Sequence, residues 1–101
     1  MENVDSTNFN NFISADTSLV QFSASWCGPC KTLSRTMSDL APEFTKTQMG
    51  KIDIEECMDI ANKFNIRAVP VVILFANGEE KARTIGAKNA SVMREFIKDN
   101  L

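Results

Sequence analysis

Apolar residues recur along this chain with two different periods, which predict strands and helices. Strand patterns occur in three segments, 18–24, 49–54 and 71–75. The last of these is an unbroken apolar run, as in a strand that is covered on both faces. Apolar residues at helical spacing occur in four segments, 9–13, 31–45, 57–64 and 92–101.

A hairpin and a short leading strand complete the predicted elements. Asn77-Gly78 is a strong signal for a tight turn, which would join the strand at 71–75 to one at 80–86. A short strand is expected near Asn3. Strands that alternate with helices predict a parallel sheet with right-handed crossovers, and the hairpin adds an antiparallel edge. We therefore expect an α/β fold with helices on both faces of a mixed sheet.

Size and charge narrow the classes of function. The chain has 101 residues, which suits one domain spanning 1–101, and 44% of the residues are hydrophobic. The net charge is −2 with both signs interspersed, so neither a nucleic-acid partner nor a membrane partner is expected. The polar, acidic start of the chain lacks the pattern of a signal peptide, which predicts a cytoplasmic protein.

The chain contains three cysteines and no histidine or tyrosine. Without histidine, neither a Cys-His dyad nor a Ser-His-Asp triad is possible. An odd number of cysteines in a reducing compartment favours redox catalysis or metal binding over a structural disulfide framework. A zinc site would need all three cysteines and a carboxylate, and it is a rival interpretation. No metal is expected.

The most informative motif is Cys27-Gly28-Pro29-Cys30, between Trp26 and Lys31. It lies between the strand predicted at 18–24 and the helix predicted from residue 31. Two thiols at this spacing can form a disulfide when the backbone turn holds them close together. The junction also places the first sulfur at the positive end of a helix dipole, which stabilises a thiolate.

The motif and three later segments resemble the thioredoxin family. The first segment is Trp26 to Lys31, which is similar to the active-site motif of the family. The others are Ile66-Arg67-Ala68-Val69-Pro70, Phe75-Ala76-Asn77-Gly78-Glu79 and Gly86-Ala87. The resemblance covers nearly the whole chain. It implies a single thioredoxin domain with a central mixed five-stranded sheet flanked by four helices.

The resemblance also implies an activity, that of a protein disulfide reductase and dithiol electron carrier. Cys27 would be the exposed thiol that attacks a target disulfide, and Cys30 the buried thiol that resolves the mixed disulfide. No bound cofactor is implied beyond the redox-active disulfide of these two cysteines. Electrons would come from a flavin-dependent thioredoxin reductase. Ribonucleotide reductase, peroxiredoxin and methionine sulfoxide reductase are the implied targets of a monomeric carrier.

The resemblance further implies a docking surface around Cys27. Its members would be apolar or small residues, Trp26, Val69, Pro70, Gly86 and Ala87. The Val69–Pro70 bond would be cis, leaving the backbone of Val69 free to pair with an extended substrate segment. Within the motif, Gly28 permits a tight turn and Pro29 suits the first turn of a helix.

Gln21 and Lys51 depart from the family pattern. Gln21 stands where the family has a buried aspartate below the cysteines, and Lys51 matches the lysine that pairs with that aspartate. An amide cannot ionise or act as a base. One interpretation is that a water held by Gln21 relays the Cys30 proton, and the other is that Gln21 is a hydrogen-bonded buried amide.

Two further alternatives stay open from the sequence. Cys57 is either a packed, inert thiol or a regulatory or dimer-forming thiol, and the second role requires exposure. The whole chain is either a reductase or an interaction module of the same fold with weak or vestigial redox activity. A third class, oxidants or isomerases of secreted proteins, would have a leader and a different central dipeptide.

Overall fold

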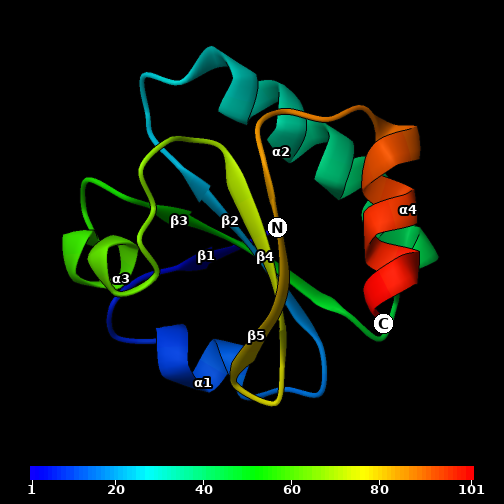
Figure 1. Cartoon of the computed structure of the whole chain (residues 1–101), viewed down its shortest axis with the longest axis horizontal. Coiled ribbons are helices and arrows are strands. Elements are labelled where there is room, and N and C mark those ends of the chain that lie inside the picture. Colours follow the sequence, from blue (N-terminus) through cyan, green and yellow to red (C-terminus); the bar gives the residue numbers. More distant parts are fainter.

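Five strands form one sheet in the order β1-β3-β2-β4-β5, with four helices around it (Figure 1). The computed structural model describes all residues 1–101. The strands are β1 (Glu2–Val4), β2 (Ser18–Ser23), β3 (Gln48–Asp53), β4 (Val71–Ala76) and β5 (Glu79–Ile85). The helices are α1 (Phe9–Ile13), α2 (Gly28–Leu40), α3 (Met58–Lys63) and α4 (Ala90–Asn100), with a 3₁₀ turn, η1 (Ala41–Glu43), after α2. The predicted five-stranded mixed sheet with four helices is confirmed.

The sheet is parallel on one side and antiparallel on the other. β1, β3 and β2 run parallel, whereas β4 runs antiparallel to both β2 and β5. The expectation that only the last hairpin would be antiparallel is therefore wrong for β4. The segment 54–70, which contains α3, joins the end of β3 to the start of β4. Val71, the first residue of β4, lies opposite Phe22 near the end of β2, so this segment does not cross back over the sheet as a connection between parallel strands must.

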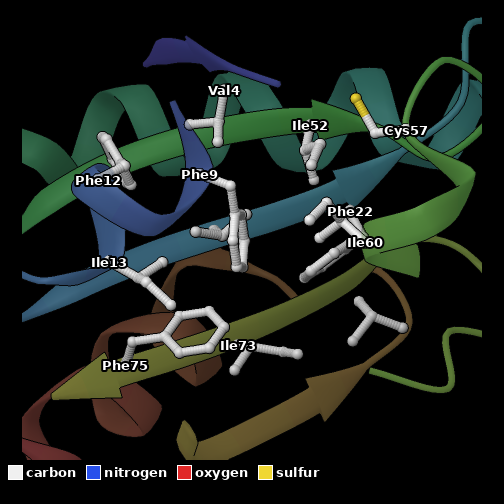
Figure 2. Packing of buried hydrophobic residues seen from close by; sticks show 12 residues of the cluster. Val4, Phe9, Phe12, Ile13, Phe22, Ile52, Cys57, Ile60, Ile73 and Phe75 are labelled. Atoms are coloured by element: carbon white, nitrogen blue, oxygen red, sulfur yellow. The ribbon is translucent and has the colours of Figure 1, made fainter. Parts of the chain in front are cut away.

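Two apolar cores lie on opposite faces of the sheet. Between the sheet and the helices α1 and α3, Figure 2 shows the larger cluster, in which Phe9 packs edge to face with Phe75, their ring centroids 5.8 Å apart. The other face is covered by α2 and α4, whose Leu33, Met37 and Met93 meet β2, β3 and β4. β4 contributes alternate residues to both cores, which explains its unbroken apolar run.

Gly50 allows the strand β3 to pack closely against two neighbours. A β-carbon at this position would lie 2.6 Å from Cγ2 of Val4 and 2.8 Å from Cζ of Phe12. Real β-carbon contacts do not reach such distances, so the larger core depends on the missing side chain.

The boundaries of α2 differ from the predicted helix at 31–45. The helix begins at Gly28, because Cys27 already serves as its N-cap, and it ends at Leu40. Pro42 then restricts the chain to the 3₁₀ turn. The predicted hairpin is confirmed, with positive φ angles of 52° at Asn77 and 88° at Gly78.

Candidate active site

Cys27 and Cys30 form a disulfide at the junction between β2 and α2. Their Cα atoms are 5.3 Å apart, within the usual range for a disulfide. β2 is buried along its full length and fixes the approach to the junction, while α2 holds Cys30 in its first turn. The two sulfurs are thus held between a fully buried strand and the first turn of a helix.

The sulfur of Cys27 caps the N-terminus of α2. Cys27 is extended, with φ −91° and ψ 105°, and its Sγ accepts a hydrogen bond from the backbone N–H of Cys30 at 3.1 Å. Free N–H groups at a helix start carry partial positive charge. This geometry favours negative charge on the Cys27 sulfur.

Cys27 is only 4% exposed and Cys30 is 2% exposed in this disulfide form. The expectation that Cys27 is an exposed residue is therefore wrong here, whereas the burial of Cys30 is confirmed. Both cysteines pack with Ala24 in a small cluster, against which the half-buried Ile54 and Val69 lie. These contacts, together with the bond between the two sulfurs, leave little of Cys27 open to solvent.

The residues around the dithiol are much more accessible than the sulfurs. Trp26 is 68% exposed, which favours a surface role over a place in the core. Gly28, Pro29 and Lys31 are also exposed, and Pro29 lies in the first turn of α2 as predicted. Nothing lies within 4 Å of a β-carbon built on Gly28, so this side of the motif is open.

Two loops from the other half of the chain meet beside the dithiol. The Val69–Pro70 bond is cis, as predicted, and Val69 contacts the cysteine cluster. The N–H of Gly86 donates to the carbonyl oxygen of Pro70 at 2.8 Å, which joins the two loops. Pro70 is buried, so the accessible part of the expected docking surface consists of Trp26, Ala87 and the half-buried Val69 and Gly86.

Gln21 lies on β2, and its amide contacts the resolving end of the motif. It is 1% exposed, and its Nε2 donates to the carbonyl oxygen of Cys30 at 2.9 Å and to Oγ of Ser23 at 3.0 Å. Gln21 is therefore a buried amide whose nitrogen is hydrogen-bonded. A water relay of the Cys30 proton through Gln21 stays a prediction. Lys51 is opposite Gln21 in the register of β2 and β3, but it is exposed and forms no salt bridge.

A cleft of about 450 Å³, lined mostly by polar residues, reaches Cys30. Only three of its twelve lining residues were predicted as site residues, Cys30, Lys31 and Lys51. The others include Asn3, Asp5, Ser23, Ser34, Asp53 and Glu56. The parallel pairing of β2 with β3, which places Ser23 opposite Asp53, is what could have pointed to this cleft.

One exposed apolar residue beside the site was also missed. Ile85 is 59% exposed at the end of β5, directly before Gly86 and opposite Val71 in the register. Its signal in the sequence is weak, because an apolar residue at the end of a strand is usually assigned to the core.

The remaining candidates lie apart from the dithiol. Cys57 is a free thiol that is 3% exposed at the start of α3, so it lacks the exposure that a regulatory or dimer-forming role requires. The structure contains no group of three or more acidic or cysteine side chains arranged to hold a metal ion. None of its helices combines the length and the apolar character needed to cross a bilayer.

Comparison with known proteins yields consistent matches along the chain. Residues 1–99 match the family model described as Thioredoxin. The chain is 39% identical over 101 residues to a thioredoxin from Echinococcus granulosus, covering 99% of this chain and 94% of that protein. It is 37% identical over 94 residues to a thioredoxin from Chlamydia pneumoniae, covering 93% and 92% respectively. Among solved structures, oxidised mitochondrial thioredoxin 3 from Saccharomyces cerevisiae superposes with a TM-score of 0.88 at 31% identity, covering 98% of this chain and 94% of that one.

Proposed function

This chain belongs to the thioredoxin family, and we propose that Cys27 and Cys30 divide its chemistry into an attacking and a resolving role. The protein is a thiol-disulfide oxidoreductase that reduces disulfides in other proteins. Its reducing equivalents are the two thiols of the Cys27–Cys30 pair, so the reaction needs no bound cofactor. The proposal concerns the order in which the two sulfurs react.

Cys27 acts first in the proposed reaction. Its thiolate attacks one sulfur of the target disulfide, an S–S bond forms between the proteins, and the second target sulfur leaves as a thiolate. Support comes from the position of the Cys27 sulfur at the N-terminus of α2, where the Cys30 N–H points at it. Exposure does not separate the cysteines, since both are nearly covered in the disulfide form.

Cys30 completes the reaction. Its sulfur loses a proton and attacks Sγ of Cys27, which closes the internal disulfide and releases the first target sulfur as a thiolate. The target gains two electrons and the protein loses two. Support comes from the place of Cys30 within the first turn of α2, where its carbonyl oxygen accepts from the buried Gln21, whereas Cys27 lies outside the helix as its N-cap.

The proposed docking surface surrounds the dithiol on the open side. Trp26 and Ala87 offer exposed area, Val69 offers a backbone edge, and the Gly86 to Pro70 hydrogen bond holds the two loops together. Gly28 leaves space for the incoming disulfide. Pro29 and Lys31 complete the rim of this surface. Gln21 supports the site from β2 through its hydrogen bond to Cys30, and Lys51 lies opposite Gln21 on β3.

The wider setting is proposed from the family. A flavin-dependent thioredoxin reductase would return electrons to the dithiol, and ribonucleotide reductase, peroxiredoxin and methionine sulfoxide reductase are the proposed classes of target. We infer a monomer that acts as a single domain over residues 1–101 in the cytoplasm. Neither nucleic acid nor membrane takes part.

The observation that carries the assignment is the hydrogen bond from the Cys30 N–H to Sγ of Cys27. A Cys30→Ser variant, reduced and mixed with a disulfide-containing protein such as insulin, should accumulate a covalent complex through Cys27 that dithiothreitol releases. Cys27→Ser should trap no more complex than the double variant, and Cys57→Ser should turn over like the unmodified chain. Equal trapping by Cys27→Ser and Cys30→Ser would overturn the proposed order.

A further inference from the structure

One buried side-chain polar atom of the chain has no hydrogen-bond partner, and it lies at the dithiol. This atom is Oε1 of Gln21. The orientation of the amide is fixed, because the carbonyl oxygen of Cys30 can only accept and must therefore face Nε2. Ser23 Oγ accepts from the same nitrogen. Oε1 is thus left as a strong acceptor without a donor from the protein, which is a costly arrangement inside a protein.

Reduction of the disulfide creates a donor in the same place. Two electrons break the bond between the sulfurs of Cys27 and Cys30. One proton binds the Cys30 sulfur, while the other sulfur remains at the helix N-terminus as a thiolate or takes up a second proton. The disulfide offers no S–H group, whereas the buried Cys30 thiol does. The unpaired acceptor and the new donor therefore belong to residues that already touch.

We propose that Oε1 of Gln21 accepts a hydrogen bond from the Cys30 thiol in the reduced protein, and that this bond shifts the redox equilibrium toward the dithiol. The inference rests on the proposed function, since it requires that Cys27 and Cys30 cycle. Freed from Cys27, the Cys30 side chain can change its rotamer and direct its S–H toward the amide. Gln21 is then a positioning residue that stabilises the reduced form.

The direction of the effect follows from the two redox states. In the disulfide form Oε1 is unpaired, so Gln21 disfavours that form. In the dithiol form the same oxygen has a donor, so Gln21 favours it. The contacts of Nε2 are to Ser23 and to the main chain, which are present in both forms, and they cancel in the comparison.

The test is the equilibrium of the full chain with glutathione, in which two glutathione molecules supply the electrons and protons and form one disulfide. Gln21→Met keeps the length of the side chain and removes the oxygen. We expect the ratio of disulfide to dithiol at a fixed glutathione poise to rise about threefold to tenfold, because a thiol is a weak donor. This increase corresponds to a reduction potential of the Cys27–Cys30 pair that is lower by about 14 to 30 mV. Gln21→Leu should give a change of the same sign.

The matched control is Ser18→Ala. Ser18 is a fully buried polar residue at the other end of β2, and its hydroxyl donates to the carbonyl oxygen of Phe12 at 3.0 Å. Its loss should lower stability equally in both redox forms and leave the glutathione equilibrium unchanged. A second readout is the S–H stretching band of the reduced protein in a Cys57→Ala background, which should move to higher frequency when Gln21→Met removes the acceptor.

The outcomes separate this inference from the proposed function. An unmodified chain that equilibrates with glutathione, combined with an unchanged ratio in both Gln21 variants, would overturn the role of Gln21 alone. A ratio that moves toward the dithiol would overturn it as well. Failure of the unmodified dithiol to exchange with glutathione would overturn the proposed function and this inference together.

Discussion

The backbone N–H of Gly86 donates a hydrogen bond of 2.8 Å to the carbonyl oxygen of Pro70. The bond continues the pairing of β4 with β5 one step beyond the Val71 and Ile85 pair, and so fixes the two loops that border the dithiol. Gly86 has a φ angle of 92°, a region that other residues rarely adopt. The shape of the docking surface therefore depends on the absence of a side chain at this position.

Gly86→Ala should destabilise the protein and impair target reduction. Forcing a non-glycine residue into this backbone region costs about 1–2 kcal/mol, which urea unfolding would measure. Movement of the Pro70 loop should also slow insulin reduction. Gly28→Ala is the control for stability, because a β-carbon there meets nothing within 4 Å and the φ angle is not positive. Equal stability of the two variants would contradict this account.

Gly50→Ala should destabilise the protein by overpacking the larger core. The added methyl group would lie 2.6 Å from Val4 and 2.8 Å from Phe12, so these side chains or β3 must move, at a cost of about 1–3 kcal/mol. Chemical unfolding gives the value. In a Val4→Ala background the same change should cost less, since one clash is gone. Purely additive effects of the two substitutions would contradict the steric explanation.

Glu43→Gln should lower stability at neutral pH and have little effect in acid. Glu43 in η1 accepts from Nε and Nη2 of Arg94 in α4, at 2.7 and 2.9 Å, and these hydrogen bonds hold the pKa of the Glu43 carboxyl below its usual value. A lowered pKa means that the stabilisation is complete above the unfolded pKa, about 4.3. It is lost as the pH falls through the folded value.

The comparison is a series of unfolding curves from neutral pH to acid, with Glu95→Gln as an exposed control that forms no salt bridge. The difference between the unmodified chain and Glu43→Gln should shrink in acid, and also at high salt, since the pair is partly exposed. A difference that is constant with pH would show that the carboxylate charge is not responsible.

Cys57 should behave as an inert core residue. At 3% exposure its thiol should react slowly with an alkylating reagent in the folded, oxidised protein, and the rate should rise steeply as denaturant unfolds the chain. Cys57→Ala should abolish the signal. Rapid labelling of the native protein, or a disulfide-linked dimer under mild oxidation, would instead support a regulatory thiol.

The sequence was sufficient for features that depend on local pattern. The run from Val71 to Phe75 predicted a central strand because burial on both faces requires apolar residues at every position. Asn77-Gly78 predicted the hairpin because both residues accept positive φ angles. The cysteine motif was recognisable because strand, turn and helix follow one another directly.

Features that depend on packing between distant segments could not be predicted in the same way. The antiparallel direction of β4 depends on where the segment 54–70 returns the chain to β2, with Val71 opposite Phe22, and no local pattern of residues encodes that pairing. The burial of Cys27 depends on Ile54 and Val69, far along the chain. The cleft beside Cys30 is lined by residues at the ends of β1, β2 and β3 and by residues of α2, so it exists only once these elements are assembled.

The separation of the cysteine cluster from the two large cores has an evolutionary consequence. Ala24, Cys27 and Cys30 form a group of their own beyond the end of the central strand β2, in contact with the larger core through the half-buried Ile54. Substitutions around this group can accumulate without creating cavities in the layers that hold the sheet together. Lineages can therefore retune which partners are recognised, and protein engineers can do the same, while the scaffold keeps its tolerance to mutation.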